Sequence, residues 1–253
     1  MTQLPAPIAC NRVRELLDGE RCAHIDLRHG YLDVLGSYEP PTYRAIQRMM
    51  RSTGYTPIYE WGRSVFRLVA KLHEPTRPDD RARIIRSLHL SPGKTVLDIG
   101  CGPGAFSALF GAAVGNDGLA IGIDASAQML QRAVSENGGT SVAYLRADAE
   151  RLPLTDEAAD AVTCLAALYL INGPFQALDE MTRVLRSGGR IVILTSRAPG
   201  GSTVTRASRA LQAFSGIRMF GHDEIVVNLR ERGFIDIEQQ TGGWSQTITA
   251  TKG

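Results

Sequence analysis

The sequence has little of what marks several common classes of protein. It contains only four cysteines among 253 residues, Cys10, Cys22, Cys101 and Cys164, and no two of them stand in a C-x-x-C spacing. This pattern favours neither a disulfide framework nor a thiolate metal site. We therefore expect free thiols in a reducing compartment.

Strong charge and long apolar runs are also absent. The formal net charge is +2, which is too small a field to indicate a nucleic-acid partner. No apolar run approaches the roughly 18 residues that cross a bilayer, and the first residues lack the basic-then-apolar order of a secretion signal. We expect a cytoplasmic protein with no nucleic-acid partner and no stable membrane insertion. The sequence leaves homodimer formation open.

From residue 91 onward, strand-like apolar runs alternate with helical patterns. Runs such as 119–123 and 191–194 are continuously apolar, as expected for strands that are buried on both faces. This alternation predicts a doubly wound α/β fold with a mainly parallel sheet. The last two runs, 235–239 and 245–251, flank a pair of glycines and predict a closing antiparallel hairpin.

The first 90 residues have a different character, because prolines repeatedly interrupt short helical patterns. We expect residues 1–90 to form an N-terminal helical cap or lid, and residues 91–253 to form the main domain. The stretch 197–222 is rich in Ser, Thr, Gly and Arg and interrupts the strand–helix alternation. It is expected to be an insertion that contributes to the acceptor pocket.

The most informative stretch is Val96–Gly104, where an apolar strand runs into a glycine-rich turn and then into a helix. Its glycines stand at alternate positions, so the backbone can turn sharply and no Cβ separates the main chain from a ligand. Gly100, Gly102 and Ala105 also satisfy the loose dinucleotide fingerprint G-x-G-x-x-G/A, which is a weak signal alone. A nicotinamide-dependent oxidoreductase therefore stays open at this point.

Acidic residues stand at the ends of three successive predicted strands. Asp98 precedes the first glycine, and its carboxylate would repel a pyrophosphate on the turn but favour a cation such as an α-ammonium group. Asp124 ends the next strand, where it can accept hydrogen bonds from ribose hydroxyls. Asp148 and Ala149 come after the third strand, where an adenine edge can be read. The pattern fits adenosine joined to an amino acid better than it fits a dinucleotide.

At these residues the chain resembles the class I S-adenosylmethionine-dependent methyltransferases, of the broad subgroup that modifies small molecules and lipids. The resemblance covers the glycine turn, the ribose strand at 122–126, the adenine segment at 148–154 and the turn at 183–190. It implies a seven-stranded sheet whose last strand is antiparallel, S-adenosyl-L-methionine as cofactor and S-adenosyl-L-homocysteine as product. The cofactor-binding candidates are Asp98, Gly100, Cys101, Gly102, Gly104, Asp124, Ala125, Met129, Asp148, Ala149 and Leu165.

The residues after Cys164 narrow the choice of acceptor. The Asn/Asp-Pro-Pro-aromatic motif of families that methylate amide or nucleobase amino groups is missing there, and so is a carboxylate cluster for a metal ion. We therefore expect no metal and a small, hydrophobic or lipid-like acceptor that is methylated on oxygen, carbon or nitrogen. A non-catalytic scaffold or regulator that binds the same cofactor is the alternative.

Catalytic residues are harder to predict, because an activated methyl group needs mainly positioning and exclusion of water. A base is needed only where the nucleophile retains a proton at working pH. The aromatic residues Tyr55, Tyr59 and Trp61 are candidates to roof the acceptor, and Tyr169 is a candidate to contact it. His222, just before a predicted helix, is the best candidate base.

Overall fold

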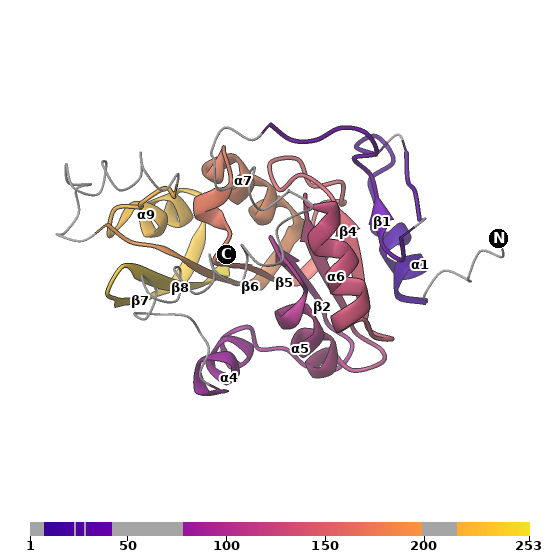
Figure 1. Cartoon of the computed structure of the whole chain (residues 1–253). Helices are drawn as coiled ribbons and strands as arrows, with labels where there is room; N and C mark the ends of the chain where they lie inside the picture. The colour runs from indigo at the N-terminus through magenta and orange to yellow at the C-terminus, as the bar shows by residue number, and fades with distance from the viewer. Residues whose placement is uncertain (1–7, 23, 28, 42–77, 199–216) are drawn as a thin grey trace.

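The computed structural model describes residues 8–22, 24–27, 29–41, 78–198 and 217–253 (Figure 1). Residues 42–77, which include the acceptor-side candidates Tyr55, Tyr59 and Trp61, lie outside the described residues. So does most of the predicted insertion. No helix in the described ranges is both long and apolar enough to cross a membrane.

The core is one mixed sheet with strand order β1-β4-β3-β2-β5-β6-β8-β7. The strands are β1 (Leu32–Asp33), β2 (Thr95–Ile99), β3 (Leu119–Asp124), β4 (Val142–Arg146), β5 (Ala159–Leu165), β6 (Leu185–Ser196), β7 (Phe234–Gly242) and β8 (Ser245–Lys252). Neighbours from β1 to β6 pair in parallel, whereas β8 is antiparallel to both β6 and β7. The predicted closing hairpin and doubly wound order are confirmed.

The sheet has eight strands in the described chain, so the predicted number of seven is wrong. The additional strand is β1, which pairs with β4 through Leu32↔Leu145 and Asp33↔Arg146. A two-residue strand is too short to show any periodicity in a sequence. Its helix neighbour, α1 (Ile8–Glu15), buries Ala9, Cys10 and Val13 in the core of the sheet. These parts of the N-terminal segment therefore pack into the same body as the sheet.

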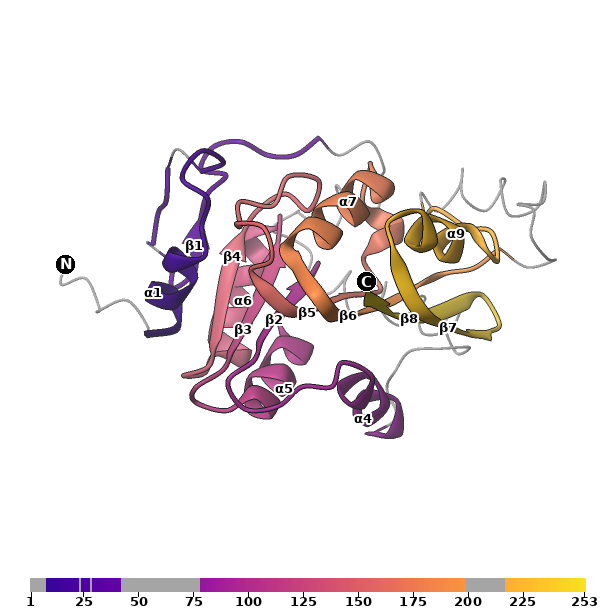
Figure 2. The ribbon, with the colours of Figure 1, turned by 180° about the vertical axis from the view of Figure 1, so that it is seen from behind.

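Helices cover both faces of the sheet. One face carries α4 (Pro78–Ser87), α5 (Ala105–Val114) and α6 (Ala127–Asn137), whose apolar residues form one buried cluster. The other carries α1, α7 (Pro174–Val184) and α9 (Glu224–Glu231), which share a second cluster. Figures 1 and 2 show α4 and α5 below the sheet, with α7 and α9 above it.

The sheet brings several loops to one edge, because the carboxyl ends of parallel strands point the same way. Ile99 of β2 lies beside Ile123 of β3, and Asp124 of β3 lies beside Arg146 of β4. The loops after β2, β3, β4 and β5 therefore start next to one another. This edge is where open α/β sheets bind ligands.

The central strands should dominate stability. Ile121 of β3 is fully buried, whereas Ile235 of β7 is 53% exposed. We expect Ile121→Ala to lower the free energy of unfolding by about 2–5 kcal/mol through lost burial and a residual cavity, and the matched Ile235→Ala to lower it by under about 1 kcal/mol. Urea unfolding of both variants measures this, and equal losses would contradict the placement of β3 in the core.

Candidate functional site

The turn between β2 and α5 has a backbone that glycine alone adopts easily. Gly100, Gly102 and Gly104 have φ values of +71°, +53° and +81°. A Cβ at Gly100 would clash with Ala167, and one at Gly104 would clash with Tyr144. Around Gly102, in contrast, no atom of the described residues other than its chain neighbours lies within 4 Å of the position a Cβ would take. The main chain at Gly102 therefore faces open space, where a ligand can approach it closely.

Asp98 lies beneath this turn and is only 3% exposed. Its two carboxylate oxygens accept hydrogen bonds from Ser107 Oγ at 2.7 Å and from Thr163 Oγ1 at 3.0 Å. Burial raises the pKa of Asp98 from 3.8 to about 6, although the two hydroxyl hydrogen bonds lower it. The carboxylate thus ties β2 to α5 and β5. Because Asp98 is buried, its negative charge acts on the glycine turn electrostatically and not through an exposed carboxylate oxygen.

Asp124 joins the glycine turn to the loop after β3. One carboxylate oxygen accepts from the backbone N–H of Gly102 at 3.0 Å, and the other accepts from that of Ser126 at 2.8 Å. Because Asp124 is only half-buried, a ligand's hydroxyl groups can reach its carboxylate from this edge of the sheet. Ser126 caps α6 by accepting from Met129 N at 3.4 Å.

The other predicted cofactor contacts differ in how far they reach the surface of this edge. Cys101, Ala125, Asp148, Ala149 and Leu165 are half-buried there, whereas Met129 is only 4% exposed and packs inside.

Two of these side chains already have local roles. Asp148 Oδ1 accepts from the N–H of Glu150 at 3.0 Å, which shapes the turn after β4. Burial, Asp124 and Asp98 together raise the pKa of the Cys101 thiol well above its usual value, so this thiol is neutral. Within the described ranges, no group of three or more His, Cys, Asp or Glu residues is placed to hold a metal ion.

Two of the three predicted catalytic residues, Tyr169 and His222, fall within the described residues, and they lie on different elements. Tyr59 lies outside the described residues. Tyr169, in the short 3₁₀ helix Leu168–Leu170 after β5, is 6% exposed and packs in the core cluster.

His222 lies near β7, at the opposite edge of the sheet from β1, where its backbone carbonyl accepts from the side chain of Gln239. Three strand steps separate β7 from β5, which is about 14 Å. Its Nε2 stands 3.7 Å from Asp223 Oδ1. Its buried Nδ1 has no hydrogen-bond partner among the described residues.

Several residues of this edge are not among those predicted from the sequence. Ser107 and Thr163 hold Asp98, Tyr144 packs against Gly104, and Arg146 contacts the loop after Asp124. The one available signal was a polar residue inside an otherwise apolar helix or strand. That signal does not say which partner the polar group will meet.

The residues present fit an adenosine-linked amino acid. The open cradle at Gly102 admits close approach of a ligand to the main chain. The half-buried carboxylate of Asp124 is an acceptor that ribose hydroxyls can reach, and the buried charge of Asp98 favours a cationic group nearby. A pyrophosphate on this turn would face two carboxylates instead.

Comparison with known proteins agrees with this geometry. Residues 97–193 match the sequence family described as "Methyltransferase domain". A ubiquinone/menaquinone biosynthesis C-methyltransferase, UbiE of Hahella chejuensis, is 34% identical over 133 residues. That match covers 51% of this chain and 53% of the relative. The chain thus spans about half the length of the curated relatives it matches.

Solved structures show the same fold. The YcgJ protein of Bacillus subtilis superposes with a TM-score of 0.57 at 24% identity, covering 64% of this chain and 70% of that one. A phosphoethanolamine N-methyltransferase 2 of Haemonchus contortus, bound to phosphomonomethylethanolamine and S-adenosylhomocysteine, gives a TM-score of 0.67 at 16% identity. It covers 84% of this chain and 61% of that protein.

The raised pKa of Asp98, about 6 against 3.8, predicts a specific pH dependence. Because the folded protein binds this proton more tightly than the unfolded chain, the stability that Asp98 contributes is present below pH 4 and is lost as pH rises through 6. Relative to Asp98→Asn, wild-type unfolding free energy should fall by about 3 kcal/mol across this window, from about two pKa units. Urea unfolding at pH 4, 5, 6 and 7 measures the difference, and a flat difference would contradict the buried charge.

Proposed function

We propose that this chain, whose residues 97–193 match a methyltransferase domain, transfers a methyl group from S-adenosylmethionine to oxygen, carbon or nitrogen of a small, hydrophobic acceptor. The observation that carries the proposal is the open main chain at Gly102 between the two carboxylates Asp98 and Asp124. This arrangement suits a ligand with ribose hydroxyls and a positive charge.

The proposed cofactor contacts rest on the positions of the side chains. Gly100–Gly104 gives close access to the main chain, and Asp124 accepts from the ribose hydroxyls. Asp148 and Ala149 border the adenine. The same edge of the sheet is lined by Ala125, Cys101 and Leu165. The field of Asp98 favours the α-ammonium group from beneath, through water or the turn. Met129 supports this wall from inside the core.

S-adenosylmethionine supplies, when bound, a methyl group that is already activated by its sulfonium charge. The chain then has to bind the acceptor, orient its nucleophilic atom in line with the methyl group, and exclude water. Tyr59 and Tyr169 are proposed on the acceptor side. His222 is proposed as the base for an acceptor that retains a proton, with Asp223 facing its Nε2.

The proposed acceptor is a hydrophobic small molecule. The quinone-biosynthesis C-methyltransferase among the relatives supports an apolar acceptor and transfer to carbon. We propose that residues 40–75 of the N-terminal segment 1–90, the segment after Cys164 and the insertion 197–222 form the walls of the acceptor pocket on the main domain, residues 91–253. A cytoplasmic location and a homodimer remain expectations within this proposal.

Removal of the ribose-binding carboxylate should weaken cofactor binding. We expect Asp124→Ala to lower the affinity for S-adenosylhomocysteine by about tenfold or more, which corresponds to about 1.4 kcal/mol. The substitution removes the carboxylate oxygens that accept hydrogen bonds from the ribose hydroxyls. Isothermal titration calorimetry measures this affinity. Unchanged affinity in Asp124→Ala would remove Asp124 from the site.

The open space at Gly102 provides a second test with a matched control. Gly188 also has a positive φ, +74°, and open space around it, but it lies in the exposed turn before the buried part of β6. Alanine at either position should cost about 1–2 kcal/mol of stability from backbone strain. Only Gly102→Ala should weaken S-adenosylhomocysteine binding, by about tenfold or more. Equal binding by both variants would place the ligand elsewhere.

Activity itself separates the enzyme from the scaffold alternative. Incubation with S-adenosylmethionine and a metabolite extract should yield a product heavier by one CH₂ unit, detected by mass spectrometry. Cofactor binding without any such product across extracts would favour the scaffold. Micromolar binding of a reduced nicotinamide cofactor, seen by fluorescence titration, would instead favour an oxidoreductase.

A further inference from the structure

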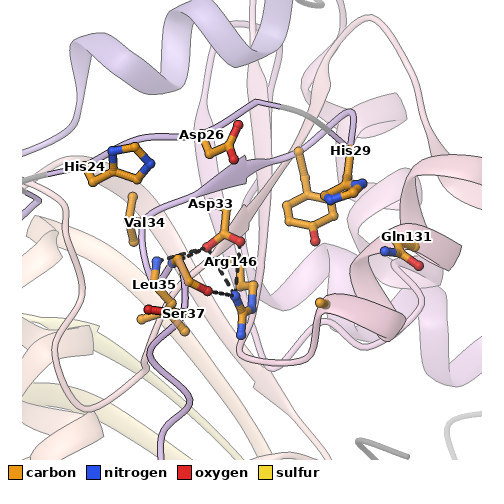
Figure 3. A pocket seen from close by; sticks show the side chains of 12 residues that line it. His24, Asp26, His29, Asp33, Val34, Leu35, Ser37, Gln131 and Arg146 are labelled. Atoms are coloured by element: carbon orange, nitrogen blue, oxygen red, sulfur yellow. Dashed lines mark hydrogen bonds and ion pairs between the residues drawn. The ribbon is translucent and has the colours of Figure 1, made fainter. Parts of the chain in front are cut away.

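Arg146, the last residue of β4, is a buried cation that none of the proposed cofactor contacts includes. Its side chain is 6% exposed and pairs with Asp33 of β1, with Nη1 lying 3.0 Å from Asp33 Oδ2. Nη1 also donates to the carbonyl of Gly36 at 2.8 Å. Figure 3 shows the Arg146 and Asp33 side chains turned toward one another, with dashed lines marking their contacts.

The third contact of Arg146 reaches the loop after β3. Its Nε donates to the carbonyl oxygen of Ala125 at 3.2 Å. That carbonyl belongs to the peptide unit between Ala125 and Ser126, and the N–H of the same unit donates to Asp124 Oδ1 at 2.8 Å. One rigid, planar peptide therefore connects the guanidinium on one side with the Asp124 carboxylate on the other. Polarisation of the carbonyl by a cation also strengthens the N–H as a donor.

A cavity lies beside the ion pair between Arg146 and Asp33. The cavity has a volume of about 650 Å³ and is bordered by β1, the loop 34–37, the start of α6 and Arg146 itself. Polar contacts through Arg146 connect residues 33–36 with the loop after β3. Asp33 fixes its own turn by accepting from the N–H groups of Leu35 and Gly36.

We propose that Arg146, anchored by Asp33 of β1, is a positioning residue that holds the Asp124 carboxylate in its ribose-binding orientation through the Ala125–Ser126 peptide. This role rests on the proposed function, because it assigns Asp124 to the ribose. It gives the edge strand β1 a part in cofactor affinity, although none of its residues touches the glycine turn.

The test uses the full chain and calorimetry with two ligands, S-adenosylhomocysteine and its 2′-deoxyribose analogue. Arg146→Lys keeps a cation for Asp33, but a single ammonium group cannot also reach the Ala125 carbonyl in the geometry of a guanidinium. The matched control is Arg21→Lys, because Arg21 also ties the N-terminal segment to the main body, through Glu180 at 2.9 Å on the α7 side. Thermal unfolding of both variants reports any general loss of stability.

We expect the wild type to prefer S-adenosylhomocysteine over the deoxy analogue by about tenfold. Arg146→Lys should weaken S-adenosylhomocysteine binding by about tenfold and abolish that preference, whereas Arg21→Lys should retain both affinities. Wild-type affinities in Arg146→Lys, or a loss that is equal for the two ligands, would overturn the inference.

A wild type that binds neither ligand would overturn the proposed function, and this inference with it. If Arg146→Lys does not fold, Asp33→Asn replaces it under the same criteria. That variant keeps an oxygen that accepts from Leu35 and Gly36 but removes the negative charge that anchors the guanidinium.

Discussion

The candidate site depends on a buried carboxylate that holds three elements together. Asp98 accepts from a hydroxyl of α5 and a hydroxyl of β5, while its own backbone belongs to β2. Hydrogen bonds to a charged group are each worth about 1.5–3 kcal/mol, and here they offset part of the cost of burying the charge. Burial still dominates, since the pKa rises to about 6. The glycine turn therefore rests on a fixed negative charge.

Asp124 links this frame to the next strand. By accepting from Gly102 and Ser126 it couples the glycine turn to the start of α6, so a ligand bound at one loop meets a preformed second loop. Preorganisation of this kind lowers the cost of ordering side chains on binding. The chain of contacts continues outward through Ala125 and Arg146 to Asp33 at the edge of the sheet. The glycine turn and the N-terminal strand β1 are thus parts of one hydrogen-bonded system.

The two halves of the proposed site differ in how they are built. The cofactor side lies on strand ends and on a turn with restricted backbone angles, all anchored in a close-packed sheet. The acceptor side is expected from segments outside the strand–helix alternation. Such an arrangement lets one rigid scaffold serve different acceptors through changes in its loops, and the fold alone does not identify the acceptor.

Local sequence was enough for the alternation of strands and helices after residue 91, the closing hairpin and the glycine turn, because apolar periodicity and the freedom of glycine act within a few residues of one another. It also predicted which strand ends carry Asp98 and Asp124. The tertiary structure alone decided that β1 joins the sheet, that Ser107 and Thr163 meet Asp98, that Arg146 reaches Ala125, and that His222 lies about three strand spacings from β5. Those contacts join residues up to 113 positions apart, and their choice of partner depends on packing, which no local pattern encodes.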